Sequence, residues 1–166
     1  RPHVPATPAR YAARPSHAPH CPTLRCQNPL MSSTPSMLHI RAAHPHESYA
    51  LQALFASAIH TRAQASYTPA QLDAWSHARD TRGFLFDIMR LGKHFLVAEE
   101  HGTLHGFGAV ENDCIVLLYA HPEAPHGTGS QLLQALEDIA AAEGTTTLTL
   151  TSSLNAEGFY RTHGYE

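Results

Sequence analysis

The chain lacks the features that define several large protein classes. Its apolar stretches are interrupted by polar residues well before the roughly 20 residues that a membrane-spanning helix needs. The basic, apolar and small-residue pattern of a signal peptide does not open the chain. With 166 residues, 43% hydrophobic and 15% charged, the composition fits one α/β domain in the cytoplasm, with no membrane partner.

Cysteine is also scarce. Cys21, Cys26 and Cys114 are too few and too scattered for a disulfide framework, and their odd number fits a reducing compartment. We expect Cys114 to be a buried strand residue. The group formed by His17, His20, Cys21 and Cys26 does not match the spacing of zinc ligands, and compositional bias explains the 14 histidines. No metal site is therefore predicted.

Acidic residues and glycine are missing from residues 1–36, which hold four arginines and eight of the twelve prolines. Such a segment buries too little apolar area to offset the entropy of ordering, so we predict a disordered Pro/Ala-rich tail. Residues 37–166 then form the single predicted domain, with seven basic and fourteen acidic residues and a net charge of −7. This acidic balance argues against nucleic acid as a partner, because phosphate binding needs clustered Lys and Arg.

Hydrophobic periodicity predicts an ordered series of helices and strands in this domain. The predicted strands are 37–42, 95–99, 104–110, 114–119 and 147–151, and the predicted helices are 47–65, 68–75, 83–91, 129–143 and 155–162. Thr68 with Pro69 is a typical helix start, and Asn155 is expected to cap the last helix. This order predicts an α/β (α+β) fold, a mixed sheet with a crossover helix after the fourth strand.

A glycine turn lies between the apolar strand 114–119 and the helix that follows. Gly127, Gly129 and Ser130 open that helix, so unpaired backbone N–H groups and the positive end of the helix dipole favour an anion. A P-loop would need a lysine after the second glycine, where Gln131 follows Ser130, and a dinucleotide fingerprint would need a third glycine in place of Leu132. Both alternatives fail, while an ordinary tight turn remains open.

Three segments in order, Leu117–Pro122, Gly127–Gly129 and Asn155–Tyr165, resemble the GNAT superfamily of acetyl-CoA-dependent N-acetyltransferases. The segment Tyr67–Trp75 also looks like one found in small bacterial members. The resemblance implies a GNAT-like mixed central sheet flanked by helices. Family members continue after Tyr165 into further strands, so it also implies that the last strands are missing from this chain.

The resemblance further implies a binding site for acetyl-CoA, the acetyl donor. The backbone amides of His126, Gly127, Thr128, Gly129 and Ser130 would hold the pyrophosphate. Leu118, Tyr119 and Ala120 would pair through their backbone with the pantetheine arm, as an added strand does at a sheet edge, and Asn155 completes the predicted set. The chain has Ala124 and His126 where the family usually has Gln or Arg and often Arg or Lys, which predicts weaker CoA binding.

The chemistry of acetyl transfer needs a neutral amine, a stabilised oxyanion and a proton for the leaving thiolate. By resemblance Tyr160 is the acid, and the backbone N–H of Tyr119 or its neighbour steadies the oxyanion. Our first choice of base is Glu111, acting directly or through water, with Glu99 and His121 as weaker candidates. Glu111 as a solvated turn residue and Tyr160 as an ordinary core aromatic remain open alternatives.

These features predict an N-acetyltransferase that moves an acetyl group directly from acetyl-CoA to a primary amine of a small molecule or peptide. Cys114 is not expected to carry the acyl group, because no motif places a histidine beside it. The alternatives are a non-catalytic acyl-CoA-binding or regulatory domain of the same fold and an unrelated phosphate site. The acceptor and the oligomeric state stay open, with a homodimer as one option.

Overall fold

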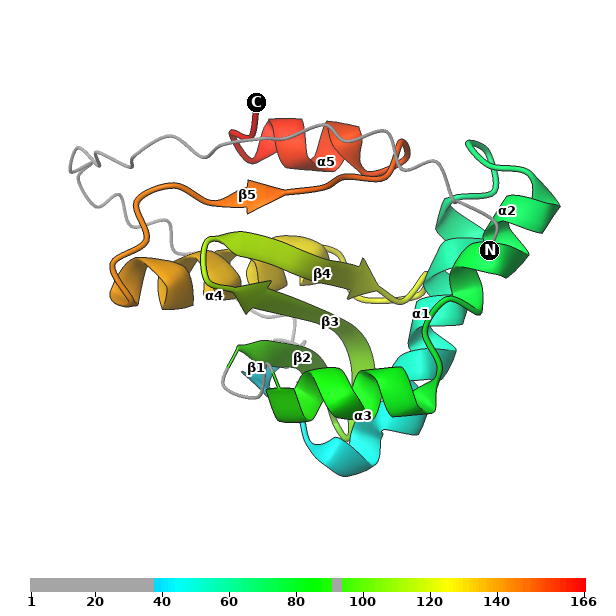
Figure 1. Cartoon of the computed structure of the whole chain (residues 1–166), viewed down its shortest axis with the longest axis horizontal. Coiled ribbons are helices and arrows are strands. Elements are labelled where there is room, and N and C mark those ends of the chain that lie inside the picture. Colours follow the sequence, from blue (N-terminus) through cyan, green and yellow to red (C-terminus); the bar gives the residue numbers. More distant parts are fainter. Residues whose placement is uncertain (1–37, 91–93) are drawn as a thin grey trace, which may run out of the picture.

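The computed structural model describes residues 38–90 and 94–166, which form a five-stranded sheet with helices against both of its faces (Figure 1). The strands are β1 (His39–Ala42), β2 (Phe95–Glu100), β3 (Thr103–Glu111), β4 (Cys114–Ala120) and β5 (Thr149–Leu150). The helices are η1 (Pro45–Glu47), α1 (Ser48–Arg62), α2 (Pro69–Ser76), α3 (Thr81–Arg90), α4 (Thr128–Ala142) and α5 (Glu157–Thr162). The predicted tail, the group around Cys21 and Cys26 and the predicted helix end at Leu91 lie outside the described residues.

The strands follow one another across the sheet in the order β1-β2-β3-β4-β5. The first four are antiparallel neighbours, whereas β4 and β5 are parallel and are joined by α4. A parallel pair needs such a crossover because the chain must return to the same end of the sheet. The predicted mixed sheet with a crossover helix after the fourth strand is confirmed.

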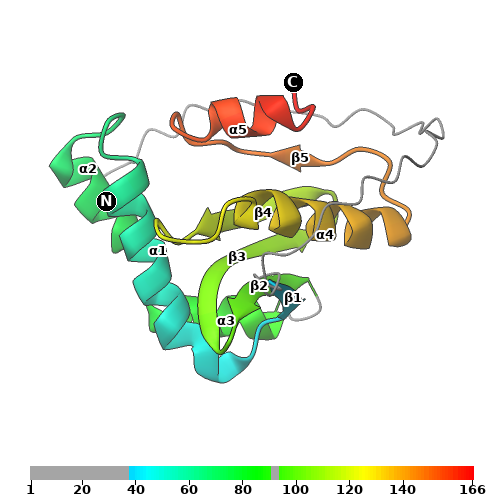
Figure 2. The ribbon, with the colours of Figure 1, turned by 180° about the vertical axis from the view of Figure 1, so that it is seen from behind.

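Each face of the sheet has its own apolar core, because neighbouring side chains of a strand point to opposite faces. In β2, Phe95 and Val97 pack in the core beneath α1, α2 and α3, while Leu96 and Ala98 pack in the core beneath α4. Figure 2 shows α1 and α4 on opposite sides of the strands. The sheet is therefore buried on both faces, and the site must form where strands end or separate.

Two glycines in β3 let α4 lie close to the sheet. A Cβ at Gly106 would lie 2.8 Å from the carbonyl oxygen of Tyr119 and 2.9 Å from Leu132, and a Cβ at Gly108 would lie 2.8 Å from Leu136. These distances are shorter than any ordinary carbon contact. Glycine at both positions thus holds the crossover helix at the height that places its first turn beside the end of β4.

A bulge interrupts the pairing of β3 with β4. Ala109 lies opposite Leu117 and Val110 lies opposite Ile115, so Val116 has no partner on β3. The extra residue reverses the alternation: Ile115 and Leu118 pack in the core beneath α4, and Leu117 packs in the other core. Bulges of this kind re-aim side chains next to functional sites.

Strand β5 is shorter than predicted. The sequence indicated residues 147–151, but only Thr149 and Leu150 pair with β4. The Thr149 amide donates to the carbonyl of Asp113 at 2.8 Å, after which the chain leaves the edge of β4. Among the described strands none pairs with this edge beyond Ile115, so backbone groups of β4 up to Ala120 face an opening between β4 and β5.

The helices match most of the predicted ranges. Thr68 caps α2 as expected, since its side chain accepts from the Gln71 amide and its own amide donates to the Gln71 side chain. The first helix ends at Arg62, earlier than predicted, because the chain then bends toward α2. The expected cap at Asn155 is wrong: Ala156 is the N-cap residue of α5 and provides no side-chain bond.

No helix within 38–90 or 94–166 has the length and apolarity to cross a membrane.

Candidate functional site

The glycine turn begins α4 with backbone donors that face outward. Gly127 is the N-cap residue, with a φ of +89° that side-chain-bearing residues rarely adopt. Within the described residues, the amides of Gly129 and Ser130 donate to no backbone carbonyl. The Thr128 amide donates to Pro125 at 3.2 Å, and its hydroxyl donates to the same carbonyl at 2.7 Å. Thr128 therefore shapes the turn, while its neighbours supply the donors.

The first turn of α4 is clamped by α5. The His163 Nε2 atom lies 2.9 Å from the Ser130 hydroxyl, and the Nδ1 atom lies 2.8 Å from the Phe159 carbonyl. The Phe159 ring in turn lies against Gly129, where an added Cβ would be 3.5 Å away. His163 was not among the predicted site residues, since a helix-ending histidine 33 positions from Ser130 carries no local signal of this contact.

A cation that the sequence did not indicate also lies beside the turn. Arg62, the last residue of α1, donates from Nη2 to the carbonyls of His121 at 3.0 Å and Pro122 at 3.2 Å. These bonds hold its guanidinium over the loop that leads to the glycine turn. Arg62 therefore places a positive charge beside this loop from a different helix.

The turn opens into a groove of about 480 Å³, called here the turn groove. All nine predicted cofactor-binding residues line it together with Tyr160 and Arg62: Leu118, Tyr119, Ala120, His126, Gly127, Thr128, Gly129, Ser130 and Asn155. The predicted residues come from β4, from the glycine turn and from the loop that leads to α5, which are separate in the sequence. A long anionic ligand lying along the free edge of β4 would touch all three.

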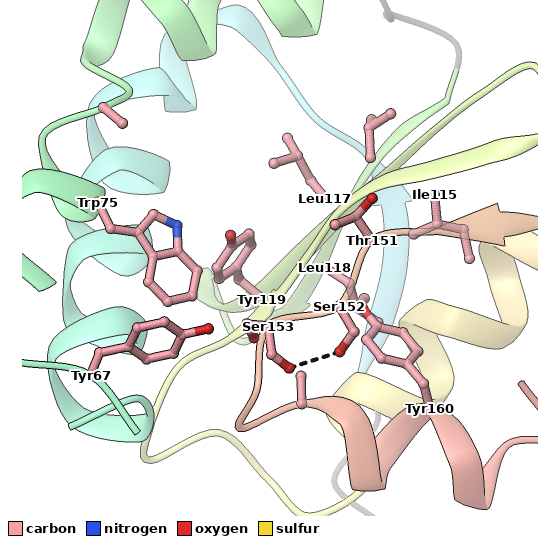
Figure 3. A pocket seen from close by; sticks show the side chains of 13 residues that line it. Tyr67, Trp75, Ile115, Leu117, Leu118, Tyr119, Thr151, Ser152, Ser153 and Tyr160 are labelled. Carbon is pink, nitrogen blue, oxygen red and sulfur yellow. Dashed lines mark hydrogen bonds between the residues drawn. The ribbon is translucent and has the colours of Figure 1, made fainter. Parts of the chain in front are cut away.

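A second cavity of about 320 Å³ continues from the turn groove, between β4 and the chain that follows β5 (Figure 3). We call it the aromatic cavity, because Tyr67, Trp75, Tyr119 and Tyr160 contribute to its wall. The remaining lining residues are Ala78, Ile115, Val116, Leu117, Leu118, Thr151, Ser152, Ser153 and Ala156. In Figure 3, Tyr67, Trp75 and Tyr119 lie on one side of the cavity and Tyr160 lies on the other.

Tyr160 stands where the two cavities meet. Its side chain is 6% exposed and packs edge-on against Phe159 and Tyr165. Burial raises the pKa of Tyr160 well above its ordinary value of 10, because the phenolate would lose its hydration. Burial likewise raises the pKa of Tyr119 to about 12. Both phenols are therefore protonated, and able to donate, over the whole neutral range.

The carboxylates predicted as bases are not brought to either cavity. Glu111 ends β3 beside the turn to β4, and its Oε1 atom lies 3.4 Å from Nη2 of Arg90. Glu99 accepts from Arg41 Nε at 2.7 Å, and this hydrogen bond lowers its pKa. His121 also lies outside the residues that line the two cavities. We therefore do not carry Glu111 forward as the base.

Other reactive side chains of the described residues do not form a second centre. No group of three or more His, Cys, Asp or Glu residues in the described part of the chain has the arrangement of a metal site. Cys114, expected to be buried, is half-buried at the first position of β4. Its Sγ atom contacts the carbonyl oxygen of the next residue at 3.8 Å. The chemistry of the site therefore depends on backbone donors, tyrosines and hydroxyls.

Comparison with known protein families finds a match over residues 63–166, to the family described as the acetyltransferase (GNAT) domain. No curated protein matches the chain significantly.

Solved structures with the same fold come from several microorganisms. A GCN5-related N-acetyltransferase from Rhodopseudomonas palustris superposes with a TM-score of 0.70 and 29% identity, covering 82% of this chain and 84% of that one. The PaiA N-acetyltransferase from Thermoplasma acidophilum, solved with coenzyme A, superposes with a TM-score of 0.69 and 21% identity. The match covers 78% of this chain and 90% of that one. A putative acetyltransferase from Salmonella typhimurium, yncA, solved with acetyl-CoA, superposes with a TM-score of 0.57 and 22% identity. The match covers 77% of this chain and 78% of that one.

Proposed function

Because the chain belongs to the GNAT family of acetyltransferases, we propose that it transfers an acetyl group directly from acetyl-CoA to a primary amine of a small molecule or peptide. One groove brings together the glycine-turn donors, the free edge of β4 and a buried tyrosine, and this observation carries the proposal. Structures of similar fold hold coenzyme A or acetyl-CoA, which supports the choice of donor.

The turn groove matches the chemical parts of CoA in order. The amides of Gly129 and Ser130, with the dipole of the 15-residue helix α4, would bind the pyrophosphate. Arg62 adds a guanidinium that suits phosphate oxygens. The backbone of Leu118, Tyr119 and Ala120 would pair with the amide groups of the pantetheine arm as a neighbouring strand does. The arm then ends where β4 and β5 separate.

In the proposed reaction, acetyl-CoA in the turn groove meets the amine in the aromatic cavity. The amine nitrogen attacks the thioester carbonyl from the aromatic cavity, and a backbone N–H of β4 near Tyr119 donates to the oxyanion. When the C–S bond breaks, the sulfur takes the electron pair and the Tyr160 hydroxyl donates to the thiolate. Because the raised pKa of Tyr160 lies far above the ordinary pKa of a thiol, about 8.5, the phenol keeps its proton and stabilises the leaving thiolate through the hydrogen bond that it donates.

The proton lost by the amine leaves without a carboxylate among the described lining residues. We infer that water at the open mouth of the aromatic cavity accepts it. The rate at low substrate should then follow the fraction of neutral amine in solution and rise with pH until the amine's own pKa. No covalent enzyme intermediate is needed, since both substrates meet directly.

The test separates transfer from simple binding. Calorimetry with CoA should give a saturable one-site isotherm, and 3′,5′-ADP, which lacks the pantetheine arm, should bind more weakly. Incubation with acetyl-CoA should then release free thiol only when a suitable amine is present. CoA binding with no thiol release for any amine of a broad panel would favour the non-catalytic alternative. Equal affinity for CoA and 3′,5′-ADP would favour an unrelated phosphate site.

A further inference from the structure

The aromatic cavity differs from a general amine pocket in the groups that form its wall. Tyr67, Trp75 and Tyr119 come from the α1–α2 loop, α2 and β4, and the rings of Tyr67 and Trp75 meet edge to face with centroids 5.3 Å apart. Ile115 and Leu117 add apolar surface from β4. A flat or apolar body fits such a wall, because aromatic rings gain most from contact with other rings and with hydrocarbon.

The same wall offers no carboxylate. Among the described residues that line the cavity there is no Asp or Glu, and the polar side-chain groups are the hydroxyls of Tyr, Thr and Ser and the indole N–H of Trp75. The carboxylate on the helix that carries Trp75 is Asp73, which is 68% exposed and lies 3.8 Å from His60, outside the cavity. A second ammonium group entering the cavity would lose its water without gaining a counter-ion.

Two arginines lie near the cavity. Arg79 forms an ion pair with Asp87 and lies over the Phe84 ring at 5.7 Å. Its positive charge also acts on the Tyr119 hydroxyl, whose pKa it lowers against the larger effect of burial. Arg62 lies at the adjoining groove. The aromatic cavity therefore has a cation at its adjoining groove and no carboxylate among its described lining residues, which disfavours a ligand with several positive charges.

The aromatic wall is held in place before any ligand arrives. The Leu154 amide donates to the Tyr67 hydroxyl at 3.0 Å, which ties the α1–α2 loop to the loop between β5 and α5. Figure 3 shows the Tyr67 hydroxyl directed toward the segment of Ser153. A wall that is fixed in advance loses less entropy on binding a rigid ligand.

We propose that the acceptor is a monoamine with an aromatic or apolar body, and that the cavity discriminates against polyamines. This inference rests on the proposed acetyl transfer and narrows its substrate class. The body of the acceptor lies against the wall formed by Tyr67, Trp75 and Tyr119, and its single nitrogen points toward the junction with the turn groove at Tyr160. While the acceptor amine still carries its proton, the faces of the aromatic rings attract its positive charge and strengthen its binding.

Trp75 makes the proposal measurable without turnover, since it is the sole tryptophan of the chain. The full chain is saturated with CoA and titrated with 2-phenylethylamine, hexylamine or spermidine while tryptophan fluorescence is recorded. We expect saturable changes with the two monoamines and an affinity for 2-phenylethylamine about tenfold above that for spermidine. Equal or tighter binding of spermidine, or no response to any amine, would overturn the proposal.

Substitutions test the two parts of the proposal separately. Tyr67→Leu should weaken 2-phenylethylamine binding about tenfold and leave CoA affinity unchanged, while Tyr67→Phe, which keeps the ring, should lose less. Tyr49→Ala, which removes a 76% exposed tyrosine of α1 outside the cavity, is the matched control. Ala78→Glu places a carboxylate on the cavity wall and should raise spermidine affinity several-fold, about fivefold by the strength of an exposed ion pair.

The outcomes also separate this inference from the proposed function. If CoA does not bind, acetyl transfer itself is refuted. If CoA binds and thiol is released fastest with spermidine, acetyl transfer holds and the monoamine proposal fails. An unchanged amine preference in both Tyr67→Leu and Ala78→Glu, with folding verified by circular dichroism, would likewise refute the role of the aromatic wall.

Discussion

The turn groove and the aromatic cavity share six lining residues, but much of each remaining wall comes from a different kind of segment; the shared residues are Trp75, Leu118, Tyr119, Ser153, Ala156 and Tyr160. The longest continuous part of the turn groove is Ala124–Ser130, which contains the backbone N–H groups that we propose as phosphate donors. The aromatic cavity is built from side chains of the α1–α2 loop, α2, β4 and the chain after β5. A site made of consecutive backbone groups can be recognised in the sequence as a short motif. A wall made of side chains from distant segments has no such motif.

Tyr160 belongs to both regions, so its removal should have the largest effect on the reaction. Tyr160→Phe keeps the buried ring and deletes only the donor to the leaving sulfur. We expect kcat to fall about 100-fold or more, the range of general acid catalysis, with the CoA dissociation constant unchanged. Steady-state kinetics and calorimetry measure the two quantities. An unchanged kcat would remove Tyr160 from the acid role and leave it as a core aromatic.

Alkaline pH should affect the tyrosine-lined region and spare the backbone donors of the turn. Burial raises the pKa of Tyr119 from 10.0 to about 12, so its stabilisation is fully present below pH 10 and is lost as the pH rises toward 12. The loss over this pH range is about 3 kcal/mol of unfolding free energy. Buried Tyr160 and Tyr165, whose pKa values are also raised, add to this loss.

Urea unfolding at pH 8, 10 and 11 measures this dependence. Tyr119→Phe should reduce the loss of stability above pH 10 and change little at pH 8. A flat stability profile up to pH 11 in the unaltered chain would contradict the burial of these phenols.

The glycine turn should respond to a change of backbone conformation. Gly127→Val places a β-branched residue at a φ of +89°, which costs about 1–2 kcal/mol or more and turns the following amides away from the ligand. We expect CoA to bind about 30-fold more weakly, since hydrogen bonds to phosphate are charge-assisted. Calorimetry compares it with Gly158→Ala, where an added Cβ meets nothing within 4 Å. Equal CoA affinity in both variants would show that the turn does not bind the ligand.

Arg62 should have the smallest effect of the four, because it is exposed to solvent. Arg62→Ala should weaken CoA binding about tenfold at low salt, and the difference should shrink at high salt, where charges are screened. Arg62→Lys should lose less, since the charge remains. Arg82→Ala, at an exposed position of α3 outside the turn groove, is the matched control. An identical loss in Arg62→Ala and Arg82→Ala would indicate a general charge effect rather than a contact.

The sequence predicted the elements of the fold and the glycine turn from local rules, whereas the other predicted residues of the turn groove came from the resemblance to the GNAT superfamily. Period and turn residues identified β2, β3, β4, α4 and the cap at Thr68, and the glycine spacing identified the donors around Ser130. Predictions about where a single side chain lies were less accurate. Asn155 does not cap α5, and Glu111 lies outside both cavities, because strand ends and helix starts alone do not say which way a side chain faces.

By itself the sequence determined the mixed sheet, its crossover helix and the glycine turn that begins α4, since these arise from periodicity and from glycine's freedom at positive φ. Only the tertiary structure decided that Arg62 and His163 reach the turn, that β5 leaves β4 after two residues, and that Tyr67 and Trp75 wall a cavity. Each depends on contacts between residues far apart in the chain, and such contacts are set by how helices and strands pack.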